Sequence, residues 1–355
     1  MTAEARDAAL WRWQHSGASS AVLSLEPMDF DAIPGWRDDN HADALACYLR
    51  SAALAPHLQR PAGDPAGVLA DSEAARVFFE AHFRPCRVSA EQGLLTSYFE
   101  PVLEGSRTRS AAFPVPVYRR PPDLSLLPTE HPLAAQGLSA ARATAAGFEP
   151  YFTRGEIEAG ALEDRGRALL YLADAVDAFI MHVQGSGVVV LEDGARVRLT
   201  FDGKNGHPYT SISKWLIAHG ELSVEDAHLE GMKAWLRAEP GREAVLAENR
   251  SYIFFRELDT SAAAPRGSSG VELYPGRSLA TDPAFHPAGT LLWVSAPGLT
   301  FQGIRFQRLT VAQDTGSAIK GPQRGDIFAG TGDAAGESAG AVRHSCDFIV
   351  FQPRC

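Results

Sequence analysis

The sequence predicts a mainly β chain that is interrupted by a mixed α and β unit. Its 355 residues are too many for one typical core and favour two domains, and a hydrophobic fraction of 45% indicates a folded protein. After Asn249, short apolar segments such as SYIFFREL, GTLLWVSAP and DFIVFQP alternate with Gly, Pro and Asp. This spacing is typical of a small barrel.

Two helices are expected near the N-terminus. In HADALACYLRSAAL the apolar residues recur with the spacing of one helix face, at Leu45, Tyr48, Leu49 and Ala52. The segment DSEAARVFFEAHF has a similar apolar stripe after an N-cap at Asp71 or Ser72. From Leu94 the pattern changes to short extended segments punctuated by Pro and Gly.

The middle of the chain predicts helices and strands together. Thr153 and Glu156 have the spacing of a capping box at a helix start. The segment DAFIMHVQGSGVVVLEDGARVRLTF reads as strand, glycine-rich turn, strand, a hairpin at Asp193-Gly194, and strand. Two further helices are expected to end at Gly220 and Pro240.

Charge and composition exclude several classes of function. A net charge of -10 without clustered Lys or Arg argues against nucleic-acid binding. The sequence has no long apolar run for a membrane span and no apolar leader. ALAC, ending at Cys47, faintly resembles a lipoprotein cleavage site, but His41 and Asp43 interrupt it. We therefore expect either a cytoplasmic protein or a chain whose leader has been removed.

The cysteines do not predict a metal centre. Cys47, Cys86, Cys346 and Cys355 are scattered, without CxxC or Cys/His spacing. Disulfides in an oxidising compartment and free thiols are both compatible with this pattern. No metal and no cofactor are predicted.

Two carboxylates remain as candidates for chemistry, because the motifs of serine hydrolases and of phosphate-binding loops are absent. Asp314 and Asp326 lie in DTGSAIKGPQRGDIFAGTG. Apolar Ile327 and Phe328 follow Asp326, so desolvation could raise its pKa and keep it protonated as a general acid. Aspartates beside glycine also close turns through their own backbone, and spacing alone leaves both roles open.

The stretch DTGSAIKGPQRGDIFAGTGDAAGESAG resembles the C-terminal signature of the MltA family of membrane-bound lytic murein transglycosylases. Other blocks resemble the family in order along the chain, from about Leu94 to Gly340: LLTSYFEPVLEGSRTRSAAFPVPVYRRP, DAFIMHVQGSGVVVLEDG, GKNGHPYTSIS, NRSYIFFRE and PGRSLATDPAFHPAGTLLW. The chain departs from the family pattern at TSYFEP, at Ser317 and at Gly325. Of these, Gly325 directly precedes Asp326 and is expected to loosen the positioning of that aspartate.

This resemblance implies a double-psi β-barrel with an inserted α+β domain and a substrate groove between them. Residues 1–104 would supply N-terminal helices and the first part of the barrel. Residues 105–247 would form the insertion, and residues 248–355 would complete the barrel with the catalytic loop.

The resemblance also implies a reaction on peptidoglycan. The family cleaves the β-1,4 bond between N-acetylmuramic acid and N-acetylglucosamine and leaves 1,6-anhydromuramoyl ends. One carboxyl suffices, because the C6 hydroxyl of the sugar replaces the water and second carboxylate of ordinary glycosidases. By resemblance that carboxyl is Asp326, while Asp314 orders the loop or assists from nearby.

Glycan binding is expected from residues in the matched blocks: Tyr98, Phe99, Gln184, Ser186, Lys204, Asn205 and Lys320. For the aromatic residues core packing is the competing interpretation, and Glu100 beside Pro101 is the rival carboxylate. The expected partners are glycan strands and other cell-wall enzymes, in the periplasm, with outer-membrane attachment of a full-length precursor. A polysaccharide-binding module without activity, or a hydrolase using Asp314 or Glu100 as second carboxylate, are the alternatives.

Overall fold

The computed structural model describes residues 23–54, 58, 65–165, 167–258, 264–301 and 303–354. Contacts divide the chain into two compact units. The first contains the described residues up to Phe99, Arg266–Gly330 and the chain from Ala334 onward; the second contains Glu100–Pro265 and Thr331–Asp333. The second unit is wider than the predicted range 105–247, because strands at both of its ends pair within its own sheet.

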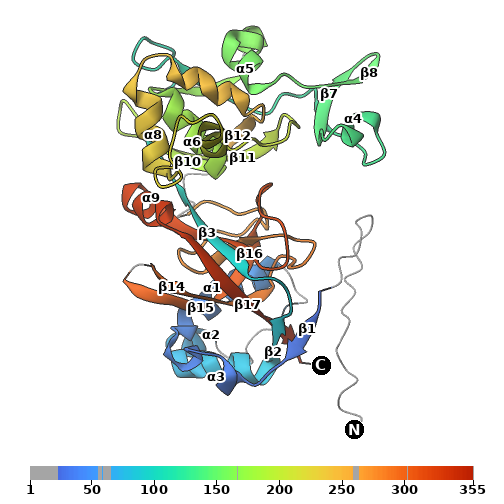
Figure 1. Cartoon of the computed structure of the whole chain (residues 1–355), viewed down its shortest axis with the longest axis vertical. Coiled ribbons are helices and arrows are strands. Elements are labelled where there is room, and N and C mark those ends of the chain that lie inside the picture. Colours follow the sequence, from blue (N-terminus) through green and yellow to red (C-terminus); the bar gives the residue numbers. More distant parts are fainter. Residues whose placement is uncertain are drawn as a thin grey trace. The chain divides into compact units, whose positions relative to one another are not determined.

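The first unit is built on a closed barrel of six strands (Figure 1). They are β3 (Gly93–Glu100), β13 (Ser278–Thr281), β14 (Leu291–Phe301), β15 (Ile304–Asp314), β16 (Arg324–Thr331) and β17 (Arg343–Pro353). The order is β17, β14, β15, β13, β16 and β3, and β3 pairs again with β17, so the ring closes. Strands β1 (Leu25–Pro27) and β2 (Phe83–Val88) extend the sheet from β17. The predicted barrel fold is confirmed.

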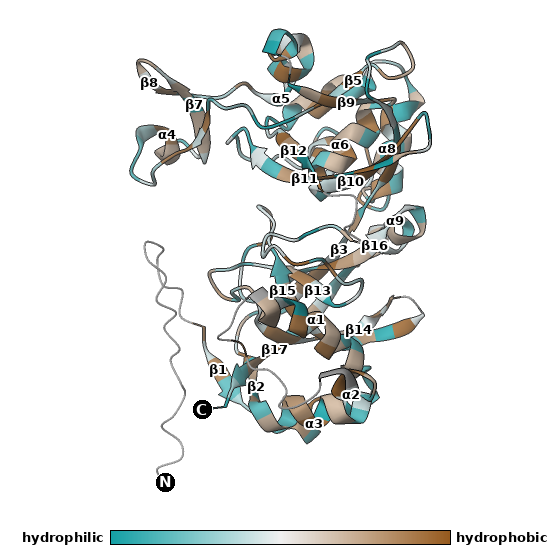
Figure 2. Cartoon of the chain, turned by 180° about the vertical axis from the view of Figure 1, so that it is seen from behind, coloured by the Kyte–Doolittle hydropathy of each residue, from teal (hydrophilic) through white to brown (hydrophobic). Residues whose placement is uncertain are grey.

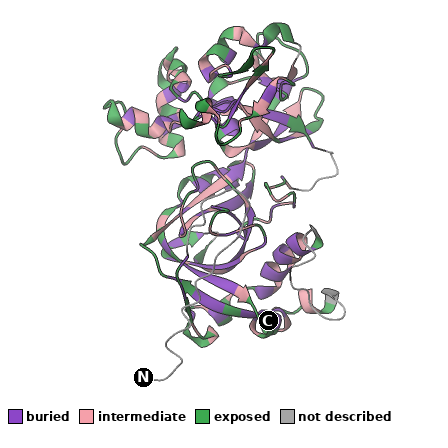
Figure 3. Cartoon of the chain, turned by 90° about the vertical axis from the view of Figure 1, so that its right-hand side faces the viewer, coloured by how far each residue is buried: buried purple, intermediate pink, exposed green. Residues whose placement is uncertain are grey.

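Helices pack on the barrel through a buried apolar cluster, and the strands of this unit are mostly buried (Figure 3). These helices are α1 (His41–Leu54), α2 (Pro65–Leu69) and α3 (Ser72–His82), whereas α9 (Asp333–Gly340) packs against Phe99 through Gly336. Trp36 and Trp293 meet at the centre of the cluster, with ring centroids 5.5 Å apart. The Asp71 side chain accepts a hydrogen bond from the Glu73 amide, so the predicted N-cap of α3 is confirmed.

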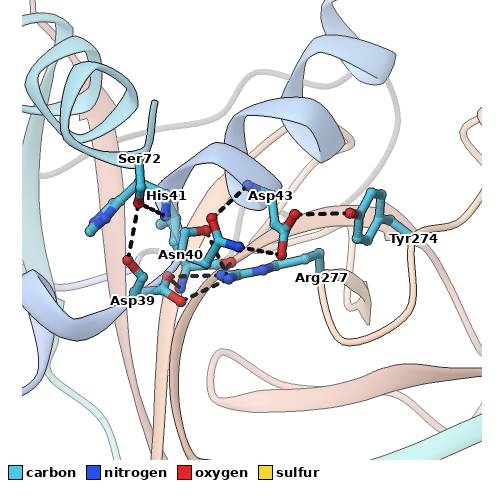
Figure 4. Close-up of polar contacts among 8 residues, drawn as sticks. Asp39, Asn40, His41, Asp43, Ser72, Tyr274 and Arg277 are labelled. Atoms are coloured by element: carbon cyan, nitrogen blue, oxygen red, sulfur yellow. Dashed lines mark hydrogen bonds and ion pairs between the residues drawn. The ribbon is translucent and has the colours of Figure 1, made fainter. Parts of the chain in front are cut away.

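A buried ion pair fixes the chain before α1 to the barrel (Figure 4). Arg277 donates through Nη1 to Asp39 Oδ2 and through Nη2 to Asp39 Oδ1, both at 2.8 Å. The same guanidinium donates to the carbonyls of Asn40 and Leu309 at 2.9 Å. The two side chains are only 6% and 5% exposed, so this pair is a structural anchor in which each charge depends on the other.

The second unit contains a six-stranded sheet in the order β12, β11, β10, β4, β9, β5. These strands are β4 (Val102–Ser106), β5 (Val115–Tyr118), β9 (Ala168–Leu172), β10 (Ser186–Leu191), β11 (Arg196–Lys204) and β12 (Ile253–Glu257). The predicted hairpin joins β10 to β11, where Asp193 accepts from the Ala195 amide and Gly194 has a φ of 81°. This geometry confirms the hairpin.

Helix α6 (Ala175–Gln184) corrects the predicted strand at the start of DAFIMHVQG. Asp174 caps the helix by accepting from the Asp177 amide, and Gly185 ends it with a φ of 80°. Phe179 and Ile180 favour strands locally, but tertiary packing buries them on a helix. The two caps were the signal for a helix in the sequence.

The remaining helices of this unit are short. They are α5 (Arg154–Glu156), which begins at the predicted capping box of Thr153, α7 (Ile212–Ala218) and α8 (Leu229–Ala238). Further 3₁₀ and π turns of this unit lie at Ile157–Ala161, Glu163–Arg165 and Arg242–Glu248. The first unit has 3₁₀ turns at Phe30–Ala32 and Trp36–Asp38. A small sheet of β6 (Leu124–Leu126), β7 (Ala140–Thr144) and β8 (Gly147–Glu149), with α4 (Pro132–Ala135), projects from the six-stranded sheet in Figures 1 and 2.

Three of the four cysteines lie in the described part of the chain. Cys47, Cys86 and Cys346 are buried free thiols, whereas Cys355 lies outside the described residues. Within the described ranges, no helix is long and apolar enough to cross a bilayer. The same ranges contain no group of three or more His, Cys, Asp and Glu side chains that could hold a metal ion.

Candidate active site

The two candidate aspartates flank the same residue of the barrel wall. Ala280 on β13 is the register partner of Asp314 on β15 and of Asp326 on β16. Directly opposed residues on neighbouring strands point to the same face of a sheet. The backbone therefore places both carboxylates on one face, with Cα atoms about two strand spacings, roughly 10 Å, apart.

Asp326 is held by two residues that the sequence analysis did not select. Thr96 on β3 donates its hydroxyl proton to Asp326 Oδ1. Arg324 Nη2 donates to Thr96 Oγ1 at 2.7 Å, and Arg324 Nη1 donates to the carbonyls of Leu94 and Gly325. Because arginine can only donate, this contact occupies a lone pair of Thr96 and directs its proton toward Asp326.

The surroundings of Asp326 favour its protonated form. Burial is the main cause that raises the pKa of Asp326, and the negative charge of Asp314 raises it further. The Thr96 hydrogen bond and the positive charge of Arg324 act in the opposite direction without cancelling the rise in pKa. A carboxyl in this state can deliver a proton.

Asp314 has more hydrogen-bond donors around it than Asp326. Its Oδ2 accepts from the Tyr98 hydroxyl at 2.8 Å, and its Oδ1 accepts from the amides of Ser268 and Thr315 at 2.9 and 2.8 Å. Burial raises the pKa of Asp314, and these hydrogen bonds oppose the rise. Asp314 therefore ties the end of β15 to β3 and to the segment around Ser268.

The other predicted residues of the first unit have different surroundings. Phe99 is 7% exposed and packs against Gly336, with a ring atom 2.9 Å from the position that a Cβ would take on that glycine. Lys320 is exposed, with its Nζ 3.6 Å from Asp282 Oδ1. Asp282 also accepts from the Gly321 amide at 3.0 Å, which anchors the loop between the two candidate aspartates.

In the second unit, three of the four predicted residues lie at the ends of α6, β10 and β11. Gln184 ends α6 and is partly exposed, and Ser186 opens β10 at 9% exposure. Lys204 ends β11, and burial lowers the pKa of its ammonium. In the described part of the chain Lys204 has no ion pair, which suits a polar ligand.

Asn205, also predicted as a substrate ligand, has its side-chain amide bonded inside the second unit. It is fully buried, its Nδ2 donates to the carbonyls of Phe152 and Arg250, and its Oδ1 accepts from the Tyr252 amide. The backbone of β7 at Ala140 packs against Gly206, the next residue.

Glu100, the rival carboxylate, is fully buried in the second unit. Its Oε1 accepts from Arg198 Nε at 3.0 Å and its Oε2 from the Thr331 hydroxyl at 2.7 Å. Burial raises the pKa of Glu100, and Thr331 and Arg198 oppose this rise. Both oxygens are thus engaged inside the unit, an arrangement that suits a structural ion pair better than attack on a sugar.

A signal for Thr96 and Arg324 was present in the sequence. Thr96 and Tyr98 alternate along β3, as Arg324 and Asp326 alternate along β16. Alternate residues of a strand point to the same face, so each chosen residue had a polar neighbour on its own face.

Comparisons with known families identify two regions of the chain. A family model described as the MltA specific insert domain matches residues 94–256, and a model described as the 3D domain matches residues 277–352. Membrane-bound lytic murein transglycosylase A of Escherichia coli strain K12 is 37% identical over 256 residues, which cover 70% of this chain. The protein of that name from Vibrio cholerae is 35% identical over 259 residues, or 71% of this chain. The matched regions span only 62% and 63% of those relatives' own lengths.

Solved structures share the fold over nearly the whole chain. A membrane-bound lytic murein transglycosylase from Agrobacterium tumefaciens is 34% identical, with a TM-score of 0.84 over 93% of this chain and 98% of that one. MltA from Neisseria gonorrhoeae is 32% identical, with a TM-score of 0.77 over 95% and 94%. Escherichia coli MltA with bound chitohexaose is 29% identical, with a TM-score of 0.72 over 97% and 98%.

Proposed function

We propose that this chain, which belongs to the MltA family of membrane-bound lytic murein transglycosylases, cleaves peptidoglycan glycan strands. The bond broken is the β-1,4 link between N-acetylmuramic acid and N-acetylglucosamine, and the product carries a 1,6-anhydromuramoyl end. The observation that supports this most directly is Asp326, a carboxyl with a raised pKa held in a fixed orientation by Thr96. Similarity to the chitohexaose-bound relative supports an oligosaccharide as ligand.

In the proposed mechanism Asp326 acts first as acid and then as base. Thr96 occupies Oδ1, so the proton resides on Oδ2, from which it passes to the glycosidic oxygen as the bond to C1 breaks. The C6 hydroxyl oxygen of the same muramoyl residue then forms the new bond to C1. The C6 hydroxyl proton passes to Asp326, which restores the starting protonation state without water as a reactant.

Asp314 has a supporting role in this proposal. It holds Tyr98 and the loop in place, and its negative charge helps to keep the pKa of Asp326 raised. Its three donors oppose the rise in its pKa, whereas Asp326 has one hydroxyl donor.

Substrate contacts are proposed for Tyr98 and Lys320 in the first unit and for Gln184, Ser186 and Lys204 in the second unit. Sugars are bound by hydrogen bonds and by contact with aromatic faces, which these side chains supply. We also propose action in the periplasm, with outer-membrane attachment of a full-length precursor and other cell-wall enzymes as partners.

The test is turnover of purified peptidoglycan with mass analysis of the released ends. The native chain should release 1,6-anhydromuramoyl products, and Asp326→Asn should lower the rate by about a thousandfold while keeping the fold. Asp333→Asn, at an exposed aspartate that begins α9, is the matched control and should retain full activity.

The other outcomes separate the alternatives. Reducing ends in place of anhydro ends would indicate a hydrolase with a second carboxylate. Binding without release would indicate a polysaccharide-binding module. Near-full turnover by Asp326→Asn would overturn the assignment of the acid.

A further inference from the structure

The second unit contains a pocket that none of the predicted site residues lines. It lies where β5 and β9 pair, with Pro116 opposite Tyr171 and Tyr118 opposite Ala168. Its volume is about 220 Å³. Two arginines and a glutamate also line it: Arg109, Arg167 and Glu163.

Tyr118 is a buried polar side chain that faces this pocket. It is 2% exposed and lines the pocket together with Ala168, its register partner on β9. The hydroxyl of a pocket-lining tyrosine can donate a hydrogen bond to a ligand.

The charges of the pocket do not cancel. Arg109 Nη1 lies 2.8 Å from Glu163 Oε1, so these two side chains neutralise one another. Arg167 is half-buried and has neither an ion pair nor a side-chain hydrogen bond to the described residues. One positive charge is therefore left beside two tyrosines, which favours a ligand with a single carboxylate.

We propose that this pocket binds a free carboxylate of a peptide stem carried by peptidoglycan. This inference rests on the proposed function, since peptidoglycan is the substrate named there. Sugar hydroxyl and acetamido groups are uncharged, so the glycan backbone offers no partner for Arg167, whereas a peptide stem ends in carboxylates. Arg167 binds the carboxylate through its guanidinium fork, Tyr118 donates a further hydrogen bond, and Pro116 and Tyr171 contact the aliphatic part.

The experiment measures binding without turnover. Asp326→Asn is titrated by calorimetry with the free stem tripeptide of L-alanine, D-glutamate and diaminopimelate, and separately with chitohexaose. Adding Arg167→Met should weaken tripeptide binding by at least about tenfold and leave chitohexaose binding unchanged. Adding Tyr118→Phe should weaken tripeptide binding by a smaller factor.

Arg196→Met, at an exposed arginine on β11, is the matched control and should bind the tripeptide as tightly as the parent. Arg167→Gln provides a second variant should Arg167→Met fail to fold. Undiminished tripeptide binding in a folded Arg167 variant would overturn the proposal. Equal affinity for the tripeptide amide, or for an unrelated acidic tripeptide, would overturn it as well. Turnover by Asp326→Asn is scored separately, so a failed catalytic assignment is distinguishable from a failed pocket assignment.

Discussion

Two aspartates near the short strand β13 have opposite environments. Asp39 is paired with Arg277, the residue directly before the strand, and both of its oxygens accept from that guanidinium. Asp326 lies opposite Ala280 of the strand and accepts a hydrogen bond from the Thr96 hydroxyl. Arg324 donates to that same hydroxyl, so Thr96 lies between the guanidinium and the carboxyl. Direct pairing makes a carboxylate a structural anchor, whereas an intervening hydroxyl leaves a carboxyl that can exchange its proton.

The largest expected effect on stability comes from breaking the structural pair. Arg277→Met should lower the free energy of unfolding by about 3–5 kcal/mol, because the charge of Asp39 stays buried without a partner. Denaturant unfolding of the purified protein measures this change. Arg37→Met, which breaks an exposed pair with Asp31, is the control and should cost less than about 1 kcal/mol. Equal losses in both variants would contradict the distinction.

The second prediction removes the hydroxyl between Arg324 and Asp326. Thr96→Val should reduce turnover by about tenfold or more, because Asp326 loses the contact that fixes its orientation. Since that hydrogen bond lowers the pKa of Asp326, its loss raises the pKa and moves the alkaline limb of the activity profile to higher pH. Thr96→Ser keeps the hydroxyl and should restore both the rate and the profile. A limb that moved to lower pH in Thr96→Val would refute the assigned geometry.

The third prediction has the opposite sign. Asp314→Asn removes a negative charge that raises the pKa of Asp326, so the acid loses its proton at lower pH. The alkaline limb should therefore move to lower pH, and turnover at neutral pH should fall several-fold. Rate measurements across pH, with protein concentration set by folded fraction, test this. A complete loss of activity at every pH would instead assign the proton transfer to Asp314.

The smallest effect is a gain in stability. The pKa of Asp326 is higher in the folded chain than its ordinary value of 3.8. The folded state therefore loses stability as pH rises from the pKa of the unfolded aspartate to the pKa of the folded one. Asp326→Asn removes this cost and should be modestly more stable than the native chain at pH 7. The difference should vanish in acid, below the pKa of the unfolded aspartate. Thermal melts at pH 7 and in acid measure this difference. Equal stability of the two proteins at pH 7 would contradict the raised pKa of Asp326.

Local chemistry made some elements predictable from the sequence. The caps at Asp71 and Thr153 and the hairpin at Asp193 depend on residues a few positions apart, and the structure contains all three. The periodicity of α1 and the short strands of the barrel depend on neighbours in the same way.

Long-range contacts set the limit of prediction. Strand alternation marks Thr96 as a polar neighbour of Tyr98 on one face of β3, but only the fold brings Thr96 to Asp326 from a distant part of the chain. The hydrogen-bond partners of Asn205, at Phe152, Arg250 and Tyr252, are likewise brought together only by the fold. Helix α6 shows the converse error, where β-favouring side chains outweighed clear caps.

The ring of the first unit also dictates an order of assembly. Strand β3 precedes the inserted unit, and the other five strands of the ring follow it. During synthesis, the inserted sheet is therefore complete while β3 still lacks both of its neighbours, β16 and β17. Until β17 emerges, β3 presents an unpaired edge, which is a known route to aggregation. We expect nascent chains that end before Arg343 to depend on chaperones and full-length chains to need them less.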